Sequence, residues 1–129
     1  GAYHAVHCRL RRPTLFAGAV GMGGIYDLSR FWGVENDDLV LRCSPLQYLA
    51  ENGIADKLAL AKAEENSLIL CAGQGAYEDE AKADTQALAD VLKAEKLPAH
   101  VELWGGDVSH EWYWWGKMLG LFVPRILEK

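Results

Sequence analysis

The chain has 129 residues, of which 50% are apolar and 24% are charged, a composition typical of a soluble globular protein with one domain. Its net charge of −5 argues against a nucleic-acid partner and against an anionic membrane surface, because both repel an acidic protein. No apolar run approaches the roughly 20 residues that span a bilayer, so no membrane partner is expected.

The amino-terminal residues and the cysteines indicate a cytoplasmic location. The first arginines follow the apolar positions instead of preceding them, which is not the order of a signal peptide. The cysteine count is odd and the chain has no CxxC motif, so we expect reduced, buried thiols at Cys8, Cys43 and Cys71.

The first elements are a helix and a strand. Residues 2 to 11 are predicted to form a helix that ends before Pro13, because a proline disfavours the helical conformation of the residue before it. The apolar run at residues 15 to 22, bounded by glycines, predicts a buried strand.

The segment at residues 29 to 66 differs in character and predicts a helical insert. Ser44 is a favoured N-cap residue, and Pro45 suits the first helical position after it. A second helix is predicted at residues 55 to 65.

A regular pattern returns after the insert. SLILCAG, residues 67 to 73, is the short continuous apolar run of a strand buried on both faces. A helix at residues 80 to 95, a strand at residues 100 to 105 and a helix at residues 112 to 127 follow. This order predicts parallel strands joined by right-handed helical crossovers, which is a doubly wound α/β layer.

Candidate functional residues follow the second and third strands. Parallel sheets place chemistry in the loops at the carboxyl ends of their strands. Glu78 and Asp79 follow one strand in GQGAYEDE, and His110 follows the next in GGDVSH. Adjacent loops would let a carboxylate orient the imidazole and stabilise its protonated form. The alternative is structural: His110 would only cap an aromatic helix, and Asp79 would only cap the helix that it precedes.

The aromatic residues beside His110 have two interpretations. Helical spacing predicts that one set lies in the core, namely Trp112, Trp115, Leu119, Phe122 and Ile126. Tyr113 and Trp114 point elsewhere and are candidates for a pocket wall.

Two other patterns are weak. His4, His7 and Cys8 lie on one predicted helix, but no matching ligands follow at a suitable spacing, so no metal is expected. The glycines of GMGG resemble a phosphate-binding loop but lack the GxGxxG spacing and a following helix start.

Several blocks of the sequence together resemble one known family. In chain order they are GAYHAVHCRLRRPTLFAGAV, GGIYDL, SPLQYL, LILCAGQGAYEDE and WGGDVSHEWYWWGKML. They are similar to the C-terminal half of the esterase D-like, or S-formylglutathione hydrolase-like, branch of the α/β-hydrolases. The resemblance covers nearly the whole chain and implies a mostly parallel sheet with helices on both faces.

The resemblance implies a Ser-His-acid triad of which this sequence carries two members. Gly1 matches the last glycine of the family's G-x-S-x-G elbow, so the nucleophilic serine is expected two positions before Gly1. His110 matches the catalytic histidine. The acid falls in GAYEDE, where Asp79 is preferred and Glu78 is the alternative. The oxyanion hole is also expected before Gly1, and the first strand is expected to lack its neighbour.

The function implied is that of a serine carboxylic-ester or thioester hydrolase, with a small-molecule ester as substrate and no metal or organic cofactor. The chain alone is expected to be inactive. Walls of the substrate pocket are expected in the segment at residues 29 to 66, together with Tyr26 and Trp114. Two alternatives are a non-catalytic α/β-hydrolase-like binding or scaffold domain and an acyltransferase that uses the same triad. Whether the protein forms a homo-oligomer stays open.

Overall fold

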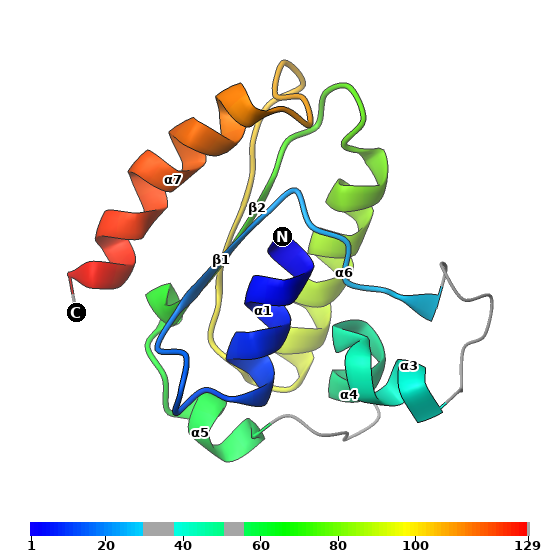
Figure 1. Ribbon diagram of the computed structural model, residues 1–129, viewed down its shortest axis with the longest axis vertical. Helices are drawn as coiled ribbons and strands as arrows, with labels where there is room; N and C mark the ends of the chain where they lie inside the picture. Colours follow the sequence, from blue (N-terminus) through cyan, green and yellow to red (C-terminus); the bar gives the residue numbers. More distant parts are fainter. Residues whose placement is uncertain (30–37, 51–55, 129) are drawn as a thin grey trace.

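The computed structural model describes residues 1–29, 38–50 and 56–128. They form a three-stranded parallel sheet with helices on both faces (Figure 1). The elements in chain order are α1 (Ala2–Arg11), β1 (Ala19–Met22), α3 (Asp38–Cys43), α4 (Pro45–Ala50), α5 (Lys57–Ala61), the short 3₁₀ helix η1 (Glu65–Ser67), β2 (Leu68–Ala72), α6 (Asp79–Ala94), β3 (His100–Leu103) and α7 (Trp112–Leu127).

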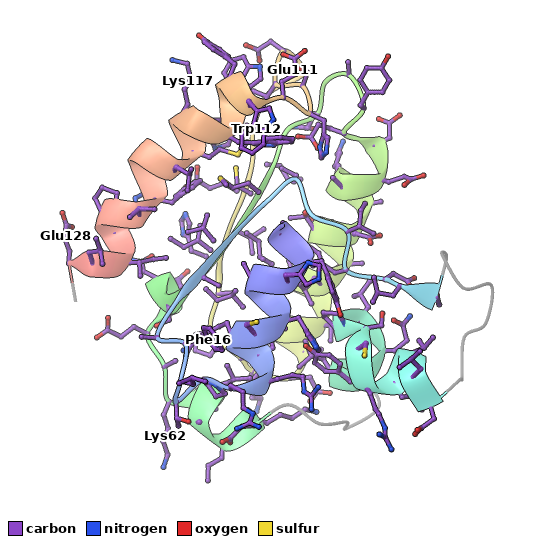
Figure 2. All side chains as sticks on the ribbon, in the orientation of Figure 1. Phe16, Lys62, Glu111, Trp112, Lys117 and Glu128 are labelled. Carbon is purple, nitrogen blue, oxygen red and sulfur yellow. The ribbon has the colours of Figure 1, made fainter. Side chains whose placement is uncertain are left out.

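The predicted α/β class is confirmed, and most elements lie where the sequence places them. The strand predicted at residues 15 to 22 begins only at Ala19, because the preceding residues form a turn. The guanidinium of Arg9 donates to the carbonyl oxygens of Pro13 and Phe16, each at 2.8 Å, and holds that turn against α1. The side chains of Leu15 and Phe16 are 71% and 40% exposed, so this part of the apolar run is not buried. Phe16 is labelled in Figure 2.

The insert predicted at residues 29 to 66 contains α3, α4 and α5. Pro45 begins α4 as expected, and the Ser44 hydroxyl accepts a hydrogen bond from the amide of Leu28 at 2.8 Å. The helix predicted at residues 55 to 65 is shorter, because α5 covers only Lys57–Ala61. Residues 30–37 and 51–55 of the insert lie outside the described residues.

The sheet has the order β1-β2-β3, with β2 in the middle. Every residue of β2 is buried, as its continuous apolar run predicts. Side chains of β2 alternate between two apolar layers. Leu68 and Leu70 pack with α1 and α6 on one face, and Ile69 and Cys71 pack with α7 on the other. Among the described residues, β1 pairs with β2 alone, so its other edge carries no strand.

The buried side of α7 is rotated relative to the predicted one. Met118 and Phe122 are fully buried, and Trp115 and Ile126 pack beside them. Trp112 and Leu119 are 82% and 42% exposed, so their predicted core positions are wrong. The side of α7 that faces the sheet is centred on Met118 and Phe122, and Trp112 and Leu119 lie at its margin.

A polar cluster anchors the carboxyl end of α7 to β3. Glu102 Oε2 lies 2.6 Å from His100 Nε2 and 3.2 Å from Arg125 Nη1, while Trp104 Nε1 donates to Glu102 Oε1 at 3.1 Å. The hydrogen bond from His100, with smaller contributions from Trp104 and Arg125, lowers the pKa of Glu102 in spite of partial burial. The ionised carboxylate is thus the form that the folded state favours.

We expect Glu102→Gln to lower the free energy of unfolding at neutral pH by about 0.5–1 kcal/mol, measured by urea denaturation. Because the folded-state pKa of Glu102 is lowered, its contribution is present above the unfolded pKa of about 4.3 and is lost as pH falls through the folded pKa. The difference between wild type and variant should therefore shrink in acid. Glu64→Gln, at an exposed glutamate, is the control. A difference that stays constant with pH would contradict this account.

Candidate active site

The candidate site lies at the carboxyl ends of the three strands. Gly23 follows β1, the loop of residues 73–78 follows β2, and the loop of residues 104–111 follows β3. Parallel strands end at the same edge of a sheet, so these three segments converge. The converging segments bring together His110 and Glu78, which are 32 positions apart in the sequence.

His110 and Glu78 form a hydrogen-bonded pair. His110 Nδ1 lies 3.2 Å from Glu78 Oε2, and the other carboxylate oxygen, Oε1, accepts from the amide of Gly73 at 3.3 Å. The Glu78 side chain is fully buried, whereas that of His110 is 39% exposed. An ionised carboxylate can only accept, so Nδ1 of the neutral imidazole is assigned as the donor. Nε2 then carries the lone pair that could take up a proton.

The two candidate acids lie in different surroundings. Asp79 is the first residue of α6 and is exposed, while Glu78 precedes the helix and is buried against His110. Tyr77, whose φ of 63° lies in the left-handed region, turns the chain just before Glu78. Glu78 is therefore the carboxylate in contact with the imidazole.

Backbone hydrogen bonds join the two loops that carry the pair. The amide of Gly75 donates to the carbonyl of Val108 at 2.8 Å, and the amide of His110 donates to the carbonyl of Ala76 at 3.0 Å. The amide of Gln74 donates to the carbonyl of Gly105 at 3.1 Å. A Cβ at Gly73 would lie 2.2 Å from the Val108 carbonyl oxygen, so the loops approach too closely for any side chain there.

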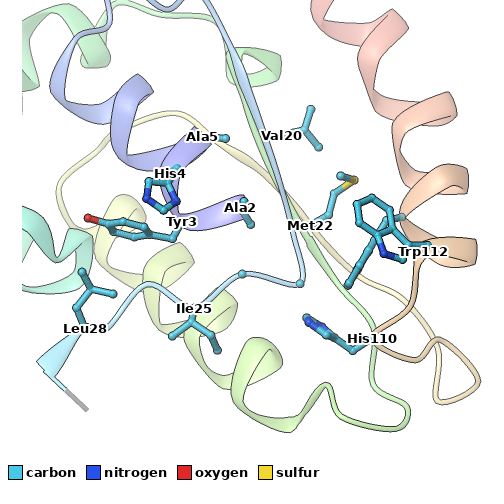
Figure 3. Close-up of a pocket in the computed structure, with 14 residues that line it drawn as sticks. Ala2, Tyr3, His4, Ala5, Val20, Met22, Ile25, Leu28, His110 and Trp112 are labelled. Carbon is cyan, nitrogen blue, oxygen red and sulfur yellow. The ribbon is translucent and has the colours of Figure 1, made fainter. Parts of the chain in front are cut away.

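A cavity of about 620 Å³ opens beside His110 (Figure 3). Its wall is mostly apolar and comes from the start of α1, the end of β1, the segment after β1 and the start of α7. The Trp115 ring lies edge-on to the His110 ring, with centroids 4.7 Å apart. The residues that line it include Gly1, Met22, Gly23, Ile25, Trp112 and Trp115.

Tyr26 and Trp114 do not line this cavity. Tyr26 is fully buried, and its backbone amide donates to Asp84 Oδ2 at 2.8 Å. Burial raises the pKa of its hydroxyl, which favours the neutral form. Trp114 packs against the apolar layer between α7 and the sheet. Neither side chain therefore lies at the wall of the cavity beside His110, where both were expected.

The neighbours of these two residues line the cavity instead. Ile25, the residue before Tyr26, lines the cavity. Trp112 and Trp115 are three positions apart, so they share one side of α7 at its first turn. Their closeness to His110 in the sequence was the signal that could have identified them. Within the insert, the cavity wall includes none of the described residues.

The other sequence candidates have structural contacts. His7 Nδ1 lies 3.1 Å from the Tyr48 hydroxyl, and burial lowers the pKa of this histidine. In residues 1–29, 38–50 and 56–128 no group of three or more His, Cys, Asp or Glu side chains could hold a metal ion. The four serines, Ser29, Ser44, Ser67 and Ser109, lie in the described part of the chain, and none of them lines the cavity beside His110.

Comparison with known proteins supports the fold. Neither family models nor curated protein sequences give a match. Among solved structures, the chain is similar to S-formylglutathione hydrolase from Staphylococcus aureus, described as the apoenzyme, with a TM-score of 0.64 and 15% sequence identity. The match covers 98% of this chain and 51% of that enzyme, so the chain spans about half its length. At this identity the match shows the fold, which is that of an α/β-hydrolase. No described helix is long and apolar enough to cross a membrane.

We expect Gly73→Ala to lower the free energy of unfolding by about 1–3 kcal/mol, because its methyl group would overlap the Val108 carbonyl and separate the two loops. The measurement is urea denaturation monitored by tryptophan fluorescence. Gly106→Ala is the matched control, since a Cβ there meets nothing within 4 Å. Equal stability of the two variants would show that the loops are not held as tightly as the structure indicates.

Proposed function

We propose that the protein is a carboxylic-ester or thioester hydrolase in which His110 is the general base and Glu78 is its orienting acid. The observation that carries the proposal is the 3.2 Å contact between His110 Nδ1 and the buried carboxylate of Glu78, at the edge of a cavity. The α/β-hydrolase fold supports this function but does not establish it, because one fold hosts many chemistries.

The buried carboxylate gives the histidine the properties of a base. Glu78 has no exposed surface, so water can screen its interaction with the ring only from the side of His110. By accepting a hydrogen bond from Nδ1–H, it fixes the tautomer with Nε2 unprotonated and stabilises the imidazolium that forms when Nε2 takes up a proton. This division of roles needs one carboxylate only, and the exposed Asp79 would have no part in it.

The nucleophile in this proposal is a serine located before Gly1 in the intact protein. Gly1 and His110 line the same cavity, so a residue shortly before Gly1 would lie near the imidazole. His110 Nε2 would take the hydroxyl proton as the serine oxygen bonds to the acyl carbon, and would then give that proton to the leaving alcohol or thiol. Water would then attack the acyl-serine ester and give a proton to Nε2. That proton would return to the serine oxygen as the carboxylic acid leaves.

The cavity favours small substrates with an apolar group. Its volume of about 620 Å³ is in the range of small-molecule sites, which is roughly 300–1,000 Å³. Met22, Ile25 and Trp112 offer an apolar surface to an acyl or alcohol group. The substrate proposed is therefore a small carboxylic ester or thioester.

We expect the intact protein to hydrolyse a short-chain p-nitrophenyl ester, and His110→Ala to reduce kcat/KM by roughly 10²–10⁴-fold through loss of the general base. Release of p-nitrophenolate measures this. Tyr113→Phe is the control, because Tyr113 lies on α7 near His110 and does not line the cavity. A protein that binds esters without turnover would be a binding domain, and this outcome would overturn the proposal. Ester product in place of free acid when an alcohol is added would indicate an acyltransferase.

We expect Glu78→Gln to reduce kcat at least about 10²-fold, because an amide does not fix the same tautomer or stabilise the imidazolium. Asp79→Asn should change kcat less than about threefold, since an exposed side chain outside the cavity wall contributes little. Parallel steady-state assays of the two variants measure the difference. The reverse order of effects would assign the acid to Asp79.

A further inference from the structure

Gly23 lies one residue beyond β1, against the pair formed by His110 and Glu78. Its amide donates to the carbonyl of Cys71 at 2.8 Å, which extends the β1–β2 ladder past the last paired residue. Its φ is 61°, in the left-handed region that residues with a side chain rarely adopt. The sheet therefore fixes where Gly23 lies, and its backbone conformation favours a glycine.

Atoms of the His110–Glu78 hydrogen bond lie directly beside Gly23. A Cβ at this position would lie 3.1 Å from His110 Nδ1, 3.2 Å from Glu78 Oε2 and 3.2 Å from His110 Cε1. The first two atoms are the donor and the acceptor of the pair. Carbon atoms in proteins rarely approach other atoms this closely, so any side chain at position 23 would displace the imidazole or the carboxylate.

Other contacts hold both partners in place. Glu78 is fully buried, and its second oxygen is held by the amide of Gly73. The backbone of His110 is held by Ala76, and its ring lies against Trp115. The contact between them is already 3.2 Å, near the upper limit for a hydrogen bond of this type, so a small displacement would break it.

We propose that Gly23 is a positioning residue for the His110–Glu78 pair. Its missing side chain leaves room for the imidazole to rest on the carboxylate with Nδ1 protonated. The catalytic consequence of this geometry rests on the proposed function, but the geometry itself does not. Gly23 also lines the cavity, so a side chain at position 23 would reduce the space beside a bound substrate.

The test is ¹⁵N NMR of the His110 ring in the intact protein, which distinguishes the two tautomers of a neutral imidazole. Wild type should show the Nδ1-protonated form. Gly23→Ala should reduce the ratio of the Nδ1-protonated to the Nε2-protonated form roughly tenfold, the size expected for loss of a charge-assisted hydrogen bond. Gly106→Ala is the matched control, since a methyl group there meets no atom within 4 Å and the ratio should not change.

A second variant separates contact from backbone strain. Asparagine tolerates the left-handed conformation better than alanine, yet its Cβ meets the same three atoms. Gly23→Asn should therefore keep the fold and still change the tautomer ratio. Folded Ala and Asn variants with the wild-type ratio would overturn the proposal. Failure of both to fold, beside a folded Gly106→Ala, would assign Gly23 a structural role alone and would also overturn it.

Activity measurements distinguish this inference from the proposed function. If the protein hydrolyses esters, the Gly23 variants should lower kcat more than they raise KM, because the base is misplaced. If no hydrolysis is found but the tautomer ratio changes, the proposed function fails and the positioning role stands. If hydrolysis depends on His110 and the ratio does not change, the positioning role fails and the proposed function stands.

Discussion

The structure of the site depends on the backbone hydrogen bonds between the loops that follow β2 and β3. The amide of Gly75 donates to the carbonyl of Val108, and the amide of His110 donates to the carbonyl of Ala76, so the loop that carries the acid is joined to the loop that carries the histidine. Gly73 makes this possible because its missing side chain lets the Val108 carbonyl approach. Main-chain bonds fix both ends of the His110–Glu78 contact, and the side chains then need little freedom to meet.

The sheet supplies the second constraint, which is the shared edge at which the three loops converge. Strand β2 is buried on both faces, with α1 and α6 on one side and α7 on the other. This packing sets the direction in which α7 leaves the site, and so places Trp112 and Trp115 beside the histidine. At the carboxyl end of α7, Arg125 donates a hydrogen bond to Glu102 on β3. The amino end of α7 follows the loop after β3, so both ends of the helix are connected to β3 or its loop.

Much of the fold could be read from local patterns. The continuous apolar run of β2, the proline at the start of α4 and the long amphipathic pattern of α6 are determined by neighbouring residues, and the structure agrees with them. The early start expected for β1 was wrong, because the apolar pattern could not show that Arg9 would hold residues 13 to 16 in a turn. Local patterns could not show the burial of Tyr26 either, because it depends on how the segment after β1 packs against α6.

By itself, the sequence determined the order of helices and parallel strands, the edge at which polar groups would gather, and His110 as the residue to examine. These follow from periodicity and from the topology of parallel sheets, which are properties of local chemistry. Only the tertiary structure decided that Glu78 meets His110 while Asp79 faces solvent, and that Trp112 and Trp115 line the cavity while Trp114 does not. The left-handed φ of Tyr77 turns the backbone just before Glu78, and the adjacent Ala76 accepts a hydrogen bond from the amide of His110, which is distant in the sequence. Local sequence patterns do not show such a contact.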